Sequence, residues 1–246
     1  MAAALDGIGS DSMSVGEILS ESWSLYTRFF WRLVATAAIV YVVLDLLAGL
    51  LYSAGRGSFG VWVIFGILTF VVTVVGWFLV EGALVLAVQD VRDGKIDSTI
   101  GELYSRVGPR LPALIPAGVL AAIGIGLGFI LIVPGLFLLT RWCLIVPAIV
   151  LEEKSAGDSF GRSNELVKGA SWPVLGVVVI TWLIGAIGGR IVGALFATIL
   201  SPFLGIWIGS LVAHSVGVPF IAAAWTLMYF KRAETGTPAP AVPAEA

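Results

Sequence analysis

The feature that most constrains this chain is the length of its uncharged stretches. Between Trp172 and Phe230 the only Lys, Arg, Asp or Glu is Arg190, and between Leu111 and Leu151 the only one is Arg141. An apolar helix of about 20 residues crosses a bilayer, whereas a soluble helix needs a polar face on every turn. The composition agrees, with 59% hydrophobic and 12% charged residues. These features predict an all-α integral membrane protein.

Six spans are predicted when the uncharged stretches are divided at turn-forming residues. The first two run from Leu33 to Gly55 and from Gly57 to Gln89. Val133-Pro134-Gly135 and Ser201-Pro202 divide the later stretches, because Pro interrupts a helix and Gly accepts positive φ. We expect one six-span domain over residues 14–232, between disordered tails at 1–13 and at the Pro/Ala-rich 233–246.

The basic residues predict the orientation of these spans. Eleven Lys and Arg fall on one side, against Arg56 and Arg190 on the other, with Arg141 inside the membrane. By the positive-inside rule, both termini are expected in the cytoplasm. The eleven are Arg28, Arg32, Arg92, Lys95, Arg106, Arg110, Lys154, Arg162, Lys168, Lys231 and Arg232.

A short pattern of hydroxyl, any residue, Gly and acid recurs before spans one, three and five. In this pattern the hydroxyl accepts from the N3 backbone N–H and the acid reaches back to the cap N–H, as in a capping box. We therefore expect three units, at about 14–98, 99–154 and 155–232, each an amphipathic interfacial helix followed by a transmembrane hairpin. The alternative is chance recurrence of helix caps. The pairs are Ser14 and Glu17, Thr99 and Glu102, and Ser155 and Asp158.

Further motifs are shared with a known family. They are Val133 to Trp142 (VPGLFLLTRW), Pro147, Glu152, Ser159 to Ser163 (SFGRS), Leu166 to Gly169 (LVKG), Val15 to Leu19 and Pro219 to Tyr229. Together they resemble the membrane domain attached to some bacterial glycerophosphoryl diester phosphodiesterases, and its stand-alone multi-pass relatives of unknown function. The resemblance implies a bacterial cytoplasmic membrane protein.

The catalytic domain that the family name implies is not expected in this chain. Such a domain needs histidines and carboxylates around a metal and a phosphate, whereas the single histidine, His214, lies in an apolar span. The sequence also has no HExxH, CxxC or Walker-type motif. We therefore expect no enzymatic activity, no cofactor and no metal. Action on glycerophosphodiesters is kept as the weakest alternative.

Ionisable residues inside the spans are the main candidates for a functional site, because each needs a partner or water. Glu81 and Arg141 both lie roughly 12–15 Å from the inner side at 1.5 Å per residue, and we expect them to pair. The pair is either a clamp that fixes helix order or part of a substrate or proton path. Asp45 lies in the outer half of the membrane, where Arg190 or His214 approaches it. His214 is either a hydrogen-bonding group there or a proton relay.

Glycines at four-residue spacing predict close helix contacts, either within the chain or across a homodimer. They are Gly124 and Gly128, Gly185, Gly189 and Gly193, and Gly205 and Gly209.

Two functions follow from these expectations. The cytoplasmic side carries 14 of the 16 acids, all but Asp45 and Glu81, so a nucleic-acid partner is excluded. The preferred function is a non-catalytic scaffold or regulatory module that binds a cytoplasmic or membrane protein partner through its interfacial helices. The alternative is a small transporter or lipid-handling protein that uses the intramembrane charges. A continuous polar cavity favours the alternative, and a sealed bundle favours the scaffold.

Overall fold

The computed structural model describes residues 14–54, 59–92 and 96–236, and these ranges contain helices and no strand. The predicted tail at 1–13 and residues 237–246 lie outside them, as do Arg56 and Lys95. The helices are α1 (Val15–Arg28), α2 (Phe30–Ala54), α3 (Phe59–Arg92), α4 (Ile100–Val107), a 3-10 turn (Gly108–Arg110), α5 (Leu111–Phe129), α6 (Val133–Trp142), α7 (Ile145–Glu152), α8 (Ala156–Val167), α9 (Ser171–Ile199) and α10 (Pro202–Gly236).

Six segments are long and apolar enough to cross a membrane: α2, α3, α5 with the preceding α4, α6 with α7, α9 and α10. The predicted membrane class and the number of spans are therefore confirmed. Residues 233–236 continue α10 as helix, so the prediction that the tail begins at 233 is wrong for these residues. No proline or glycine stands there to end the helix before Gly236.

Proline marks the predicted helix boundaries, but it acts differently from the prediction. Pro134 stands in the first turn of α6, and α10 begins at Pro202. Pro is favoured there because the first N–H groups of a helix have no intrahelical acceptor. The residue with positive φ is Ile132 (φ 59°), and Gly135 is helical. The turn between α5 and α6 therefore lies just before the predicted break.

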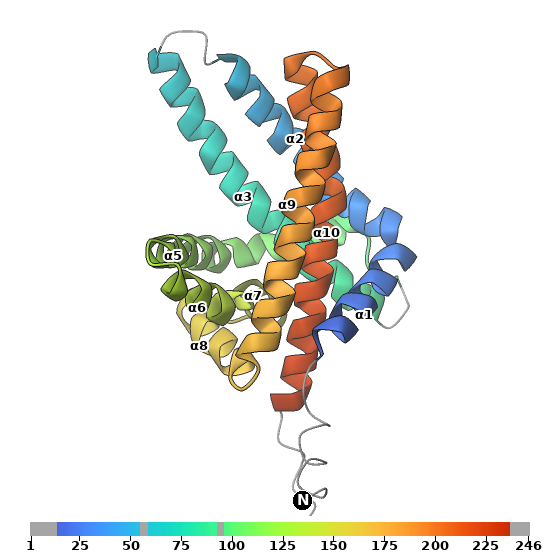
Figure 1. Cartoon of the computed structure of the whole chain (residues 1–246), viewed down its shortest axis with the longest axis vertical. Helices are drawn as coiled ribbons and strands as arrows, with labels where there is room; N and C mark the ends of the chain where they lie inside the picture. The colour runs from blue at the N-terminus through green and yellow to red at the C-terminus, as the bar shows by residue number, and fades with distance from the viewer. Residues whose placement is uncertain (1–13, 55–58, 93–95, 237–246) are drawn as a thin grey trace, which may run out of the picture.

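The long helices diverge from a common base (Figure 1). α9 and α10 run side by side along the long axis, and α10 also packs against α2. α5 lies at a steep angle to α9 and α10, so the α5–α6 hairpin points to the left of the view while the other two hairpins point upward. The short helices α1 and α8 lie near the lower end. The three hairpins are thus spread apart at their tips.

Ion pairs tie the base together. Arg32 of α2 pairs with Asp90 of α3, and both side chains are nearly buried. Farther out, Lys231 Nζ of α10 lies 2.7 Å from a carboxylate oxygen of Glu21 in α1. Further pairs join Arg92 to Glu234, Arg110 to Glu153 and Arg162 to Glu152. Several basic residues that are predicted to lie on one side of the membrane therefore form ion pairs with acids of other segments at one end of the molecule.

The fourth apolar segment is broken between α6 and α7. The buried Ser163 of α8 fills the break: its Oγ donates to the Arg141 carbonyl (2.7 Å) and accepts from the Leu144 N–H (3.2 Å). These two backbone groups would otherwise be unsatisfied at the ends of adjoining helices. The surface helix α8 is therefore built into the membrane-spanning part of the fold.

Candidate functional site

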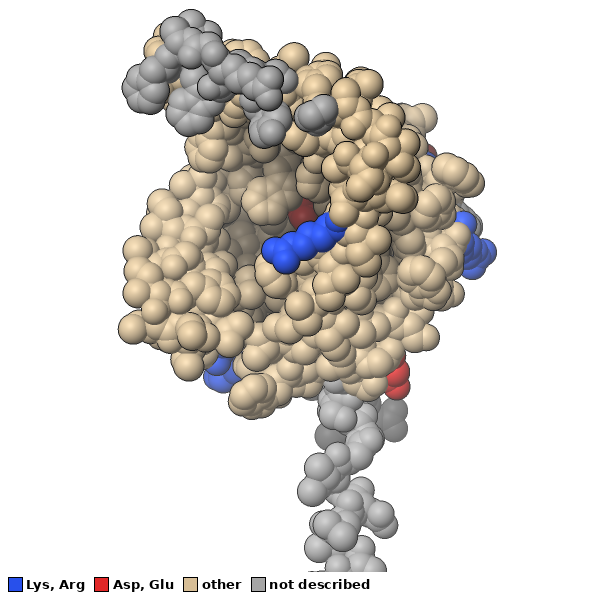
Figure 2. Space-filling model, turned by 45° about the horizontal axis from the view of Figure 1, so that its top comes forward, with Lys and Arg blue, Asp and Glu red and all other residues tan. Residues whose placement is uncertain are grey.

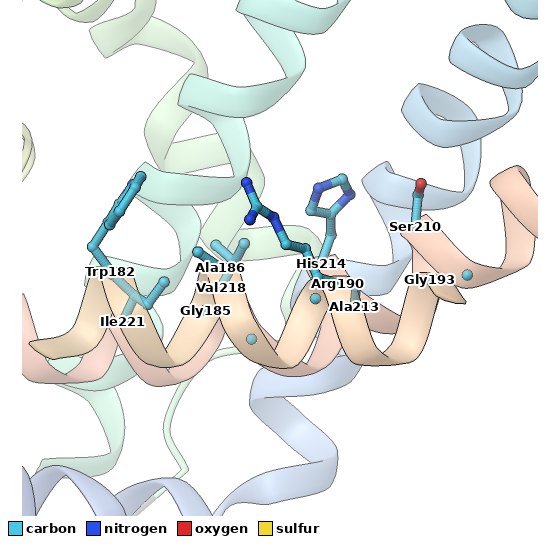
Figure 3. Close-up of a pocket in the computed structure, with 13 residues that line it drawn as sticks. Trp182, Gly185, Ala186, Arg190, Gly193, Ser210, Ala213, His214, Val218 and Ile221 are labelled. Atoms are coloured by element: carbon cyan, nitrogen blue, oxygen red, sulfur yellow. The ribbon is translucent and has the colours of Figure 1, made fainter. Parts of the chain in front are cut away.

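A cavity of about 410 Å³ lies along one face of α9 and α10. We call it the arginine cavity; its lining includes Trp182, Gly189 and Arg190 of α9 and Ser210, His214 and Val218 of α10. Figure 3 shows Trp182, Arg190, Ser210 and His214 projecting to the same side of the helix pair. The small residues between them leave the space that the larger side chains surround.

A second cavity of about 300 Å³ adjoins the first. We call it the tryptophan cavity; its lining includes Trp77 and Glu81 of α3, Trp142 of α6, Trp182 of α9 and Trp225 of α10. Trp182, Val218 and Ile221 line both cavities, so the two are neighbours, and we call them together the hollow. In Figure 2 this face of the molecule is deeply indented, a basic side chain crosses the opening, and an acidic side chain is visible at its floor.

Arg190 is the cation of the hollow. Its guanidinium makes no hydrogen bond or ion pair with any residue that the structure describes, and the side chain is exposed. It sits nine residues before the end of α9 at Ile199, within an apolar span. A guanidinium in such a place requires an anion or water, because the hydrocarbon around it solvates neither charge nor N–H groups.

Asp45 and His214 form the predicted contact in the same region. His214 Nδ1 lies 3.0 and 3.1 Å from the two carboxylate oxygens of Asp45, which is only 5% exposed. The ring also stacks on Tyr41, with centroids 4.9 Å apart. An ionised carboxylate only accepts hydrogen bonds, so beside ionised Asp45 the Nδ1 atom is the donor and Nε2 of a neutral ring is an acceptor. Of the two partners predicted for Asp45, His214 is found and Arg190 is not.

The predicted pair of Glu81 and Arg141 is not formed. Arg141 Nη1 donates to Asn164 Oδ1 of α8 (2.6 Å), and its guanidinium lies 5.1 Å from the centroid of the Phe137 ring. Because α6 is short and packs against α8, Arg141 faces the base. Glu81 instead lines the tryptophan cavity, where its carboxylate has no hydrogen bond or ion pair with the described part of the chain. The proposed clamp is therefore wrong.

The tryptophans of the hollow are held in position from behind. Trp225 Nε1 donates to Thr181 Oγ1 (3.0 Å), which itself donates to the Val177 carbonyl (2.8 Å). Trp142 packs edge-to-face on Phe160 of α8, with centroids 5.0 Å apart. A tilted contact of 5.7 Å joins Trp77 to Phe78. The aromatic wall is therefore pre-formed, with α8 supporting part of it.

The capped helix starts are present at all three predicted positions. Ser14, Thr99 and Ser155 each accept a hydrogen bond from the backbone N–H three residues later, at 3.2, 3.3 and 3.2 Å. Only Thr99 and Glu102 complete a capping box, because the Glu102 carboxylate also accepts from the Thr99 N–H. Glu17 and Asp158 lie in the first turn, where an acid complements the helix dipole.

The predicted glycine contacts are found mainly inside the chain. A Cβ on Gly128 would lie 2.9 Å from the Gly135 backbone, and one on Gly124 would meet Trp142 at 2.5 Å. Between α9 and α10, Gly205 approaches the Ala197 backbone and Gly209 approaches Gly193. By contrast, Gly193 itself has open space beside it and lines the arginine cavity.

A sequence that matches a hydrolase motif occurs in α8, but its structure is not that of the motif. Residues Gly157 to Gly161 read Gly-x-Ser-x-Gly, the pattern of a hydrolase nucleophile elbow. Here the segment is part of α8, and Ser159 is buried with its hydroxyl donating to the Ala156 carbonyl (2.8 Å). An elbow instead exposes its serine on a strand-to-helix turn. Nor do three or more His, Cys, Asp or Glu of the described ranges gather as a metal site.

Within the described ranges, the hollow thus combines apolar walls with a cation and a carboxylate that lack partners and with a paired histidine. Comparison with protein families, with curated proteins and with solved structures finds no match for this chain.

Proposed function

We propose that this protein is a lipid-handling membrane protein that binds an amphipathic lipid in the hollow. One observation carries the proposal: the two adjoining cavities of the hollow are mostly apolar, yet Arg190 lines one of them and its guanidinium has no partner among the described residues. A lipid headgroup with a phosphate supplies the missing anion, because guanidinium and phosphate form paired, charge-assisted hydrogen bonds. The acyl chains then lie against the apolar walls and the membrane.

The neighbours of Arg190 strengthen this assignment. Ser210 Oγ makes no hydrogen bond within the described ranges and lines the same cavity. His214 lines this cavity as well, but its Nδ1–H is used by Asp45 and its Nε2 is an acceptor, so it offers no donor to an anion. A guanidinium and a hydroxyl in one cavity offer several hydrogen bonds to an oxyanion.

The scaffold function is the second candidate, and exposed acids on the short helices favour it. Glu17 of α1 and Asp158 of α8 are exposed, and the Glu165 side chain of α8 is 71% exposed. A basic segment of another protein would pair with them. However, Glu165 itself lies 3.6 Å from Arg162, and Glu21, Glu152, Glu153 and Glu234 are also engaged with cations of this chain. Surface pairs of this kind contribute little to affinity, about 0–1 kcal/mol each.

Filling the hollow is expected to remove the bound lipid. Gly193→Leu places an isobutyl group in the arginine cavity without a clash at its Cβ. We expect the amount of lipid that co-purifies, measured by mass spectrometry after delipidation and re-exposure to membrane lipids, to fall about tenfold or more, since the side chain occupies the headgroup position.

A matched control is available on the same helix. Gly188 also has open space at its Cβ, but it does not line the hollow, so Gly188→Leu should retain the lipid of the unmodified protein. Equal lipid retention by both variants would overturn the proposal. A reproducible protein partner without any enriched lipid would also overturn it, in favour of the scaffold.

The membrane topology belongs to the same proposal. The base faces the cytoplasm, both ends of the chain lie on that side, and the membrane is the bacterial cytoplasmic membrane, as the positive-inside rule and the family resemblance imply. The three capped helices and their hairpins are repeats of one unit. The common cap geometry at Ser14, Thr99 and Ser155 supports this, together with an element order in which each capped helix precedes two apolar segments.

Cysteine labelling tests this topology. In a Cys143→Ala background, Glu165→Cys on α8 is expected to react with a membrane-impermeant maleimide only after the cells are permeabilised. Ser201→Cys, exposed between α9 and α10, should react in intact cells. The reverse pattern would place the base outside.

A further inference from the structure

We infer that the tryptophan cavity binds the ammonium group of a zwitterionic phospholipid, while the phosphate of the same headgroup lies toward Arg190. This inference rests on the proposed function, and it names the class of lipid. It starts from the pairing of indole rings and one carboxylate in a single cavity: Trp77, Trp142, Trp182, Trp225 and Glu81.

Indole rings are the best aromatic partners for organic cations. The negative face of the ring attracts an ammonium within about 6 Å of its centroid, and several rings around one cation form an aromatic cage. Apolar packing alone needs no such concentration of tryptophan, since aliphatic side chains fill a core equally well. Of the tryptophans, Trp225 is fixed through Thr181 and Trp142 through Phe160, so two walls of the cage hold their place without the ligand.

Glu81 gives the cage its charge selectivity. Glu81 lines the same cavity, and its carboxylate has no ion pair with a cation in the ranges that the structure covers. A lone carboxylate surrounded by apolar side chains is unfavourable unless a cation or a hydrogen-bond donor joins it. An ammonium group satisfies the carboxylate and the indole faces together.

The two ends of the hollow complement the two charges of one headgroup. The arginine cavity contributes a guanidinium and its lining has no acid, whereas the tryptophan cavity contributes a carboxylate and its lining has no Lys or Arg. Trp182 stands between them, because it lines both cavities and is 64% exposed. A zwitterionic headgroup places its phosphate and its ammonium in the matching order and leaves no net charge in the apolar part of the membrane.

Headgroup competition tests the inference. The purified protein is exchanged into nanodiscs containing equal amounts of phosphatidylethanolamine, phosphatidylcholine and phosphatidylglycerol with identical acyl chains, and the retained lipids are measured by native mass spectrometry. We expect the two ammonium lipids to exceed phosphatidylglycerol roughly tenfold. In Glu81→Gln, which preserves shape, this ratio should fall toward one while lipid is still retained.

A tryptophan variant gives a second measurement. Trp182→Leu is expected to reduce the same ratio several-fold, and Trp172→Leu, on the same helix but outside the hollow, should leave it unchanged. Glu165→Gln, at an exposed acid of the base, is the charge control for Glu81→Gln. Size-exclusion profiles and unfolding temperatures of all variants establish that each one is folded before its lipids are compared.

The outcomes separate this inference from the proposed function. If Gly193→Leu expels the lipid but Glu81→Gln keeps the unmodified headgroup ratio, the ammonium site is wrong and lipid binding stands. If phosphatidylglycerol is preferred, the hollow is an anion site only and the inference is overturned. The last experiment adds choline chloride alone. If choline displaced all of the bound lipid and bound as tightly as the lipid does, the ligand of the tryptophan cavity would be a free ammonium compound, and the inference would also be overturned.

Discussion

Asp90→Ala is expected to lower the free energy of unfolding by about 3–5 kcal/mol, because it leaves a nearly buried guanidinium without its counter-ion. The Arg32 and Asp90 side chains are 12% and 7% exposed. Asp90 also accepts from the Ser98 N–H (3.2 Å) and from Ser98 Oγ (3.1 Å), and Arg32 donates to the Ser98 carbonyl (2.6 Å). The loss therefore reaches the segment before α4. Thermal or denaturant unfolding in detergent measures it.

An exposed pair near the end of the same helix provides the control. Arg92 and Glu234 are 38% and 59% exposed, so Glu234→Ala should cost no more than about 1 kcal/mol. The double variant Arg32→Met with Asp90→Leu should recover part of the Asp90→Ala loss, because no buried charge remains. Equal effects of Asp90→Ala and Glu234→Ala would show that burial of the first pair is unimportant.

Gly135→Ala is expected to destabilise the protein by about 3 kcal/mol, at the upper end for overpacking. A Cβ at this position would lie 2.6 Å from the Phe129 backbone nitrogen and 2.7 Å from its Cα. Backbone atoms of a tight helical turn cannot move aside as a flexible side chain does, so the α5–α6 hairpin must open. The yield of monodisperse protein and its unfolding temperature in detergent measure the effect.

Gly126→Ala is the matched substitution for Gly135→Ala. It lies on the same hairpin with nothing within 4 Å of its Cβ, and it replaces Gly by a better helix former. A gain of up to about 1 kcal/mol is expected. If Gly135→Ala were as stable as Gly126→Ala, the close approach of α5 and α6 would not exist in the folded protein.

Local sequence signals predicted local structure well. Hydroxyl caps marked the starts of α1, α4 and α8, because a cap depends only on residues within one turn. Proline located two helix boundaries for the same reason, at α6 and α10. Long uncharged runs predicted six membrane-spanning segments, since the thickness of the bilayer sets the length of a helix directly.

Tertiary partners were harder to predict from the sequence. The position of each residue along its helix correctly predicted His214 as a neighbour of Asp45. The same argument wrongly paired Glu81 with Arg141, because Glu81 lines the tryptophan cavity and Arg141 contacts Asn164 of α8. Depth fixes one coordinate of a side chain, and the direction in which it points depends on how the helices pack. The break between α6 and α7 had no local signal either, because the residue that satisfies it, Ser163, belongs to another helix.

The hollow was not predicted from the sequence. Its tryptophans come from α3, α6, α9 and α10, so no single stretch of sequence contains the cage. Glycines at four-residue spacing indicated close packing, and they do bring α9 and α10 together at Gly205 and Gly209. At Gly193, however, a Cβ would point into open space beside the arginine cavity. The four-residue spacing of the glycines does not show whether a given glycine makes a helix contact or lines a cavity.

The hydroxyl of Tyr26 connects α1 to the helix that forms one wall of the hollow. It reaches from α1 to the Val216 carbonyl of α10 (2.9 Å). Burial raises the pKa of Tyr26 to about 12, so the hydroxyl remains a donor at physiological pH. Gly217 and Val218, the next residues, line the arginine cavity. A displacement of α1 must therefore break this bond or move the cavity wall with it.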